Sequence, residues 1–386
     1  MKISRQTFLK TGAVVLIGVA GGGVYRAADQ GVFSVGQGLA YEPWKDWRNA
    51  PTAPERIVSA GILAANPHNS QPWHFRIREQ AIDLYADTSR QIGVIDPFQR
   101  EMHIGLGCAL ENMMLAAQAE GFTAVLSLLH NETEPEHVAH LTLTAGQAQV
   151  ADLYTAIPNR HTNRSPYDLT RAVAPDVLTS LAALVDDAAV RVFWYADSAA
   201  RDKFSAYGLA AAEALIADEQ QSIDSGRWWR QQWSDVQAHQ DGITIDAQSF
   251  NTMTEILAKM LPDGSRQQSD AVFVQNTRDN YLATASAFGL IAVRNQDDNT
   301  QRMRCGQIWQ RMQLWATVRE LAMQPLNQIC ERADRERQQG VDAVFGRALR
   351  DLTGGDEWQG IMPFRVGYAT RAALASPRRA VQKVLL

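Results

Sequence analysis

Hydrophobic and polar positions along the chain first mark out an amphipathic helix, a polar loop and a strand. Residues 55–65 follow Pro54 and place four apolar side chains on one helical face: Ile57, Val58, Ile62 and Leu63. The run "NPHNSQPWHF", residues 66–75, breaks that periodicity with two prolines and four polar residues in a row. It leads into the strand-like stretch 74–87, and its Trp73 and Phe75 are unusual for a turn.

Two long apolar segments predict a pair of central helices. Residues 105–120 are apolar on almost every helical face, break at Gly121 and continue into a strand-like run. A helix with no polar face belongs in the interior of a molecule. Residues 306–328 repeat the same pattern far downstream, and a polar stretch that contains aspartate precedes each segment.

The two apolar segments align when Gly107 is placed on Gly306. The alignment then has four identical pairs: Gly107/Gly306, Met113/Met312, Leu115/Leu314 and Ala117/Ala316. Four identities can arise by chance in helices of this composition, but the shared surroundings favour an internal duplication. We therefore predict an α+β fold of two halves, each a β-sheet packed around a central apolar helix, related by a pseudo-twofold axis. The first half spans residues 41–155 and the second spans residues 156–386.

Residues 218–264 fit neither half. The segment is polar and carries Trp228, Trp229 and Trp233. We interpret it as an insertion in the second half with two readings. It is either a lid over a pocket or a peripheral helical pair whose tryptophans cover the surface of the core.

The first forty residues predict targeting and not fold. A basic start precedes an apolar run, residues 11–25, that is short for a bilayer-spanning helix of about 20 residues. The start resembles a twin-arginine export signal, with Gln6 where the second arginine belongs; the matching residues are Ser4, Arg5, Phe8, Leu9 and Lys10. The cleavage site at residues 38–40 is weak, so residues 1–40 are an export signal or an uncleaved membrane anchor. Either reading predicts a periplasmic protein or one anchored in the membrane and facing the periplasm.

Composition and charge exclude other classes of function. The chain has 386 residues, a formal net charge of −5 and no run of Lys or Arg, which argues against a nucleic-acid-binding protein. The three cysteines lack metal-ligand spacing and are expected to be buried free thiols. His137 and His140 lie near two glutamates, but nothing supplies further ligands, so a solvated loop is the better reading and no metal site is expected.

Two basic clusters are candidates for anion binding. Arg160 and Arg164 flank Thr162, and if this stretch opens a helix, both guanidinium groups can converge on one phosphate. The alternative is an exposed charged turn. Arg378 and Arg379 follow an apolar strand and a Gly-Tyr turn, which suits a phosphate contact and equally suits a solvated tail.

Together these motifs resemble the nitroreductase family of FMN flavoproteins. The loop matches the family pattern at Ala65, Pro67, Asn69, Gln71, Pro72, Trp73 and Phe75. The family's phosphate element is matched at Arg160, Thr162 and Arg164, and its C-terminal element at Gly367, Tyr368, Arg378 and Arg379. The resemblance covers the chain from about Arg56 to its end, apart from the insertion.

The arrangement of the motifs is similar to the fused, double-unit Acg-type branch of that family. The first half has the loop and the second half has the arginines, so the resemblance implies one FMN per chain, bound between the halves, with the insertion as a lid. The implied FMN ligands are Asn69, Ser70, Gln71, Arg160, Thr162, Arg164, Arg378 and Arg379.

The resemblance implies an exported FMN-dependent oxidoreductase. Its reaction would be a two-electron reduction of a small aromatic or quinone-like acceptor, with a small molecule or a redox protein as partner. The alternative is a flavin-sequestering protein with a closed lid. No residue stands out as a catalytic acid, base or nucleophile. The chain is expected to act as a monomer, an intrachain pseudo-dimer, or as a homodimer.

Overall fold

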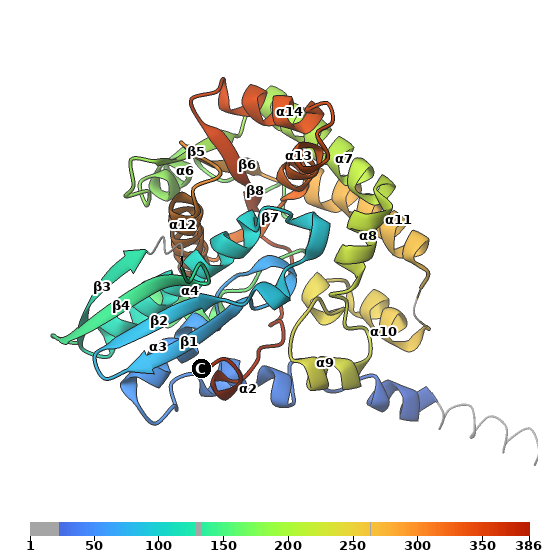
Figure 1. Cartoon of the computed structure of the whole chain (residues 1–386). Helices are drawn as coiled ribbons and strands as arrows, with labels where there is room; N and C mark the ends of the chain where they lie inside the picture. Colours follow the sequence, from blue (N-terminus) through green and yellow to red (C-terminus); the bar gives the residue numbers. More distant parts are fainter. Residues whose placement is uncertain (1–22, 129–132, 263) are drawn as a thin grey trace, which may run out of the picture.

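The structure is a computed structural model that describes residues 23–128, 133–262 and 264–386 (Figure 1). The predicted signal motif around Arg5 and Gln6 lies outside the described residues. Among the helices of the described ranges, none combines the length and the apolar character needed to cross a bilayer.

The framework of the first half is one antiparallel sheet flanked by two longer helices. In chain order its elements are α3 (Ala53–Gly61), β1 (Trp73–Arg78), β2 (Ala81–Ala86), α4 (Arg100–Ala119), β3 (Phe122–Leu128) and β4 (His137–Ala145). The predicted helix start at Pro54 is correct, because Thr52 and Glu55 form a reciprocal capping box around it. The strands are ordered β1-β2-β4-β3 and all pairs are antiparallel.

The second half repeats this plan. Its corresponding elements are α6 (Pro175–Ala182), β5 (Val190–Tyr195), β6 (Ala287–Val293), α12 (Asn299–Val318), β7 (Ala322–Pro325) and β8 (Gln359–Gly367). The sheet order is β5-β6-β8-β7, which is the order of the first sheet with each strand replaced by its counterpart. The α+β fold with two related halves is therefore confirmed.

The second half is longer because several helices lie in the connection between its first two strands. The first sheet joins β1 to β2 by a tight hairpin, whereas the connection from β5 to β6 contains the whole predicted insertion, residues 218–264. The helices added there are α7 (Ser198–Ala217), α8 (Glu219–Gly226), α9 (Trp233–His239), α10 (Thr252–Met260) and α11 (Arg266–Asn276), which a π-helical stretch (Thr277–Leu282) extends. The remaining α-helices are α2 (Glu42–Asp46), α5 (Asp152–Ala156), α13 (Gln328–Gln339) and α14 (Val344–Thr353).

The two central helices, α4 and α12, pack against each other between the sheets (Figure 1). They cross at the aligned glycines. A Cβ atom added to Gly107 would collide with the carbonyl oxygen of Met303, and one added to Gly306 would collide with that of Ile104. Each glycine faces the residue that lies three positions before the glycine of the other helix. The crossing is therefore symmetric about the pseudo-twofold axis.

Polar pairs one turn further along obey the same symmetry. Glu111 accepts a 2.7 Å hydrogen bond from the guanidinium of Arg311, and Asn112 accepts a 2.8 Å bond from the amide of Gln310. The alignment that equates Gly107 with Gly306 also equates Glu111 with Gln310 and Asn112 with Arg311. The two pairs are thus symmetry-equivalent contacts: the pair of Glu111 and Arg311 is charged, and the pair of Asn112 and Gln310 is neutral.

Two local predictions were wrong. The helix expected from residue 105 begins at Arg100, because its polar first turn is buried and satisfied: Arg100 donates to Asp334 at 2.8 Å and lies beside Glu101. The loop expected around His137 and His140 is the strand β4. Both imidazoles lie against the buried Asp83 of β2, with His140 Nδ1 at 2.6 Å from its carboxylate.

Gly107→Ala should destabilise the protein by about 2 kcal/mol or more, because a methyl group at the crossing must push the two helix backbones apart. Gly226→Ala is the matched control, since a Cβ there meets nothing within 4 Å. Urea unfolding curves of both variants measure the difference. A Gly107→Ala protein as stable as the control would contradict the tight crossing.

Candidate functional site

The loop between α3 and β1 has a strained backbone. Three of its residues, none of them glycine, adopt the left-handed conformation: His68, Asn69 and Gln71, with φ of 48°, 53° and 54°. Each such residue costs free energy, and clusters of them are typical of functional sites. The backbone amide of Gln71 donates a 2.8 Å hydrogen bond to the side-chain oxygen of Asn66, which holds the loop, and the fully buried Trp73 anchors its end.

The C-terminal tail of the second half returns to this loop and to β1. The amide of Phe75 donates to the carbonyl of Val384, and the amide of Leu386 donates back to Phe75, both at 2.8 Å. Arg378 of the tail donates to the Asn69 side chain, which in turn donates to the carbonyl of Pro377 at 2.8 Å. The tail is therefore not a solvated extension: Arg378 is only 3% exposed.

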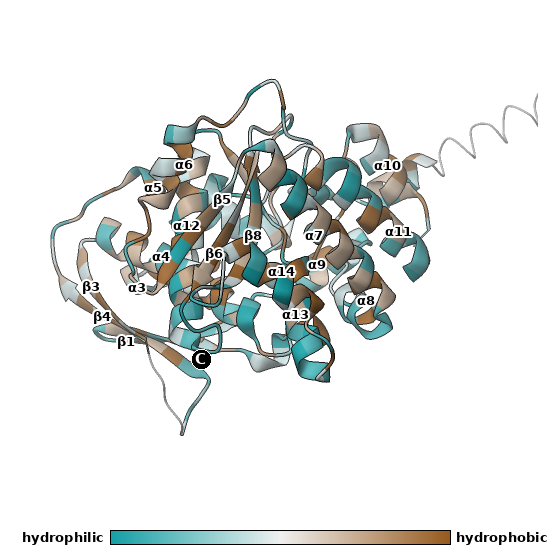
Figure 2. Ribbon diagram, turned by 90° about the horizontal axis from the view of Figure 1, so that it is seen from above, coloured by the Kyte–Doolittle hydropathy of each residue, from teal (hydrophilic) through white to brown (hydrophobic). Residues whose placement is uncertain are grey.

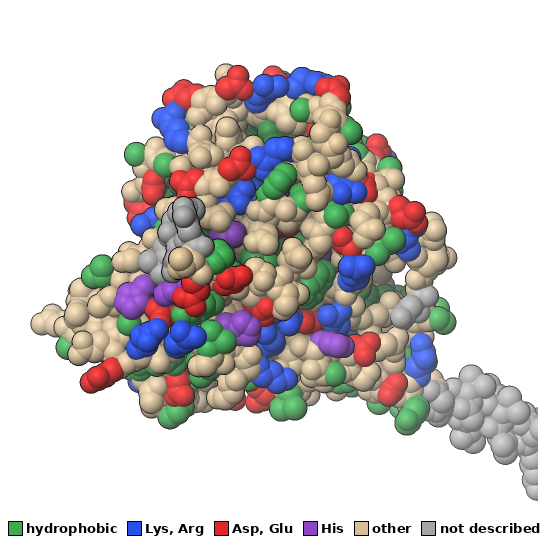
Figure 3. Space-filling view, in the orientation of Figure 1, with side chains coloured by type: hydrophobic (Ala, Val, Ile, Leu, Met, Phe, Trp, Pro, Cys, Tyr) green, Lys and Arg blue, Asp and Glu red, His purple; other side chains and the backbone are tan. Residues whose placement is uncertain are grey.

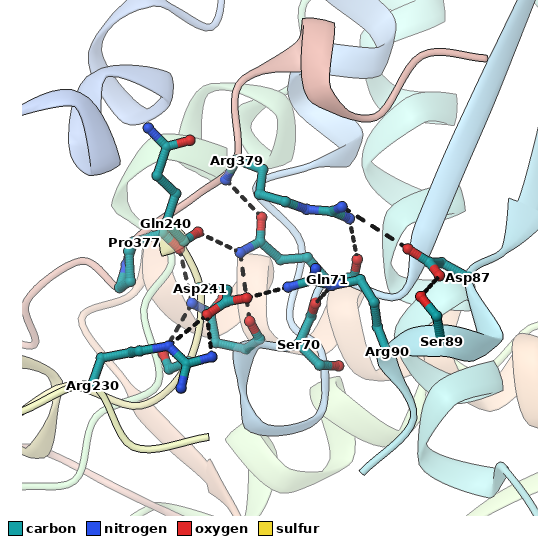
Figure 4. Close-up of polar contacts among 12 residues, drawn as sticks. Ser70, Gln71, Asp87, Ser89, Arg90, Arg230, Gln240, Asp241, Pro377 and Arg379 are labelled. Atoms are coloured by element: carbon teal, nitrogen blue, oxygen red, sulfur yellow. Dashed lines mark hydrogen bonds and ion pairs between the residues drawn. The ribbon is translucent and has the colours of Figure 1, made fainter. Parts of the chain in front are cut away.

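Gln71 joins the tail to the insertion (Figure 4). Its side-chain oxygen accepts a 2.8 Å bond from the Arg379 amide, and its side-chain nitrogen donates to the carbonyl of Gln240 at 2.8 Å. The Arg379 guanidinium donates to the Gln71 carbonyl, while the carbonyl of Ser70 accepts from Arg90. Of the predicted ligands, Ser70, Gln71 and Arg379 thus hold the loop in place.

The other five predicted ligands line one cavity of about 60 Å³: Asn69, Arg160, Thr162, Arg164 and Arg378. Sequence reasoning missed the other walls, which are Trp44, Ala65, Asn66, His68, His161, Gly242, Ile243, Ala247 and Ser376. His161 lies between the two predicted arginines in the chain, so the arginine cluster could have pointed to His161 as a lining residue. Trp44 had no such signal.

Arg160 and Arg164 reach the cavity from extended chain, and the expectation that this stretch opens a helix was wrong. The side chain of Asn163 accepts a 3.0 Å bond from the Ser165 amide, a local turn that competes with helix formation, and Pro166 disfavours a helical Ser165. Arg160 donates to Gln313 of α12 at 2.9 Å and Arg164 donates to the carbonyl of Ala247 at 3.1 Å.

The cavity carries positive charge without a compensating acid. Among the described residues, no carboxylate lies within 4 Å of Arg160, Arg164 or Arg378. Burial lowers the pKa of Arg160 to about 10 and that of Arg164 below its ordinary value, while burial and the nearby Arg160 depress the pKa of Arg378 strongly. The Nε–H groups of Arg160 and Arg378 are buried without a hydrogen-bond partner. Buried guanidinium groups with free donors and no acidic partner are suited to binding an anion.

Two neutral histidines complete the polar lining. Burial and the charge of Arg164 lower the pKa of His68 to about 4, and burial with Arg160 and Arg378 lowers that of His161 to about 3. Both imidazoles are therefore uncharged at neutral pH and do not add to the positive charge. His161 lies edge-on to Trp44, with ring centroids 4.6 Å apart.

Residues 240–249 of the insertion, here named the closing segment, cover the cavity. The backbone amide of Gly242 donates to the Asn69 carbonyl, and the Asn69 side chain donates to the Gly242 carbonyl, both at 3.1 Å. The Ser249 carbonyl accepts from the Arg371 guanidinium at 3.3 Å. Asp241 pairs with Arg90 of the first half and with Arg230 of the insertion (Figure 4). The closing segment is thus fastened to both halves of the molecule.

The donor set fits a phosphate group better than it fits a whole flavin nucleotide. A cavity of about 60 Å³ has room for a few waters or a small anion, whereas drug-sized ligands occupy roughly 300–1,000 Å³. The cavity as it stands is therefore too small for the ring system of FMN.

Comparison with known proteins gives a distant relationship. The chain is 30% identical over 114 residues to "Putative NAD(P)H nitroreductase Rv3131" of Mycobacterium tuberculosis, which is 29% of this chain and 33% of that protein. "Putative NAD(P)H nitroreductase acg" of the same organism is 31% identical over 116 residues, 28% of this chain and 34% of that protein. The chain is a distant relative of these nitroreductases. It spans about a third of the length of both, and no protein-family model matches the sequence.

A longer alignment and two solved structures extend this picture. "Uncharacterized protein Rv3127" of M. tuberculosis is 24% identical over 295 residues, 72% of this chain and 79% of that protein. The FMN and NADPH-dependent nitroreductase NfnB of a Sphingopyxis strain superposes with a TM-score of 0.39 at 16% identity, over 60% of this chain and 96% of that one. NfnB of Mycobacterium smegmatis gives 0.35 at 13% identity with the same coverage. Both scores are too low to support a functional argument.

Arg164→Met should leave the ligand-free protein equally stable or up to about 1 kcal/mol more stable, because it removes a desolvated charge that has no acidic partner. Inorganic phosphate should raise the melting temperature of the unmodified protein, and the same change should strongly reduce that rise.

Arg365→Met is the control for this pair of measurements. Arg365 is buried outside the cavity and donates to Gln324 at 2.7 Å and to the Ser165 carbonyl at 2.8 Å. Its loss leaves the buried oxygens of Gln324 and Ser165 without this donor and should cost about 2 to 4 kcal/mol, while phosphate still stabilises the variant. Equal destabilisation by both substitutions would mean that Arg164 is a structural residue.

Proposed function

We propose that the chain binds one FMN between its two halves and acts as an FMN-dependent oxidoreductase. The observation that carries this proposal is the set of three guanidinium groups in one cavity without a carboxylate partner, since charged donors of this kind favour an anionic ligand. The distant relationship to nitroreductases supports the choice of a flavin phosphate as that anion.

The residues divide into those that hold the cofactor and those that support them. Arg160, Arg164 and Arg378 would bind the phosphate together with the Thr162 hydroxyl, and Asn69, which accepts from Arg378, lines the same cavity. Gln71, Ser70 and Arg379 keep the strained loop in position.

FMN supplies two-electron redox chemistry when bound, so the protein contributes binding, electrostatics and exclusion of water. A small aromatic or quinone-like compound is the proposed acceptor, and a quinol or a redox protein is the proposed donor. The export signal or anchor proposed for residues 1–40 would place this reaction in the periplasm. Nothing in the chemistry requires more than one copy of the chain, because both halves of the site come from one chain.

Flavin sequestration is the second candidate, and the closing segment favours it. Backbone groups of residues 242–249 use donors that a ligand would otherwise engage: Ala247 accepts from Arg164, and Gly242 bonds to Asn69. If this cover closes again over bound flavin, the cofactor is kept from external reductants.

Titration of the purified protein with FMN should saturate at about one flavin per chain, seen as quenching of flavin fluorescence. Arg160→Met combined with Arg164→Met should weaken binding by about a hundredfold or more, because two charge-assisted contacts to phosphate are lost. Arg347→Met is the control, since Arg347 is an exposed surface residue paired with Asp342. Failure of the unmodified chain to take up FMN would end the proposal.

Asp241→Asn should speed FMN association and reductant access, because it removes the ion pair that ties the closing segment to Arg90. Asp342→Asn makes the same chemical change in the exposed ion pair between Asp342 and Arg347 at the start of α14, and it should have no effect. Stopped-flow absorbance with NADPH, a soluble quinol and dithionite measures both variants.

The same experiment separates the two candidate functions. An oxidoreductase is reduced by NADPH or quinol and reoxidised by a quinone or nitroaromatic compound without the substitution. A sequestering protein reacts with those reductants only after Asp241→Asn.

A further inference from the structure

Helix α10 of the insertion is amphipathic, with its apolar side turned outward. Met253 and Leu257, one turn apart, are 67% and 51% exposed, and Leu261 just beyond the last turn is 58% exposed. On the inner side, Lys259 is 5% exposed, pairs with Asp246 and has Glu255 3.7 Å away.

This orientation is unfavourable in water. A helix on the surface of a protein in water buries its apolar stripe and leaves lysine and glutamate in solvent. Here the protein buries an ammonium group and the Asp246 carboxylate, partly buries the Glu255 carboxylate and leaves three large apolar side chains outside. The arrangement is favourable where the environment of the outer side is itself apolar.

The start of the described chain adds to the same surface. Arg26 donates to the carbonyl of Met260 at 2.7 Å, and Lys259 donates to the carbonyl of Gly31 at 3.3 Å, so residues 24–33 lie beside α10. Three of these residues are exposed apolar side chains: Val24 63%, Tyr25 75% and Phe33 66%. Figure 2 shows hydrophobic residues of α10 next to the beginning of the described chain, and Figure 3 shows hydrophobic side chains on that part of the surface.

We propose that this surface, the α10 patch (Val24, Tyr25, Phe33, Met253, Leu257 and Leu261), lies on a lipid bilayer. The choice of a bilayer as its occupant rests on the residues that precede Gly23. Residues 11–22 include the apolar run "AVVLIGVA", and three basic residues stand before it: Lys2, Arg5 and Lys10. The described chain that follows this run begins beside α10, since Arg26 donates to the carbonyl of Met260.

The two segments complement each other physically. A single short hydrophobic element gives marginal and reversible membrane binding, and a second signal makes it stable. Aromatic residues such as Tyr25 and Phe33 suit the interfacial region of a bilayer, and basic side chains favour anionic headgroups. The α10 patch therefore supplies the second signal from within the folded protein, and this inference does not depend on the bound cofactor.

The test is a fluorescent label on the full-length protein. Leu257→Cys is labelled with an environment-sensitive nitrobenzoxadiazole dye, and Val344→Cys, exposed on α14, is the matched control. The native thiols do not compete, because all three cysteines are buried. Vesicles of equal parts phosphatidylglycerol and phosphatidylethanolamine are prepared with and without lipids that carry a doxyl quencher near the headgroup.

The proposal expects vesicles to blue-shift and brighten the label at position 257, and the doxyl lipid to quench it at least about threefold more than the label at position 344. A label at 257 that stays in water while the protein floats with vesicles would overturn it, because residues 1–22 would then bind alone. Protection of the label without vesicles would also overturn it. In that case dilution distinguishes a second copy of the chain from residues 1–22 folded onto α10.

Discussion

The close crossing of two helices determines where everything else in this molecule lies. At Gly107 and Gly306 the backbones of α4 and α12 approach so closely that each glycine faces a carbonyl oxygen of the other helix. Tight packing of this kind leaves no room for rotation or sliding, and the reciprocal pairs around Glu111 and Gln310 fix the register. The sheets, the loop from the first half and the arginines from the second are all positioned relative to this crossing.

The candidate site shows what such a junction can offer that a single half cannot. The first half contributes a strained loop, and the second contributes guanidinium groups from residues far along the chain, Arg160, Arg164 and Arg378. In the closed arrangement, backbone carbonyls of Leu63, Ala64 and Ala247 accept hydrogen bonds from these groups but do not neutralise them. The site therefore stays electrostatically unsatisfied while remaining sterically covered, a state that an entering anion can improve.

The sequence was sufficient for the parts of the fold that depend on periodicity and composition. The central helices, their duplication and the free buried thiols followed from apolar patterning, and the loop motif pointed to the residues that meet at the site. Periodicity failed where polar residues are buried with partners from distant segments. Arg100 begins α4 inside the core because Asp334 lies opposite, and His140 occupies a strand because Asp83 lies beneath it.

The walls of the cavity were harder to predict than its arginines. Trp44 and Gly242 reach it from segments that share no motif with the loop, and only tertiary packing brings them there. The division among the predicted ligands has the same origin. Gln71 and Arg379 carry the residue types expected of ligands, but both are used to bind the loop, the tail and the insertion to each other.

The C-terminal tail has one more consequence, for the behaviour of the protein in solution. Strand β1 is the outer strand of its sheet, and an uncovered edge of this kind is a template for pairing with another chain. The tail supplies part of the missing neighbour, since Phe75 pairs in parallel with Leu385. The residues that carry Arg378 to the cavity therefore also cover part of this strand edge. A change in the segment from Ser376 to Leu386 would consequently disturb the lining of the cavity and the cover of the sheet edge together.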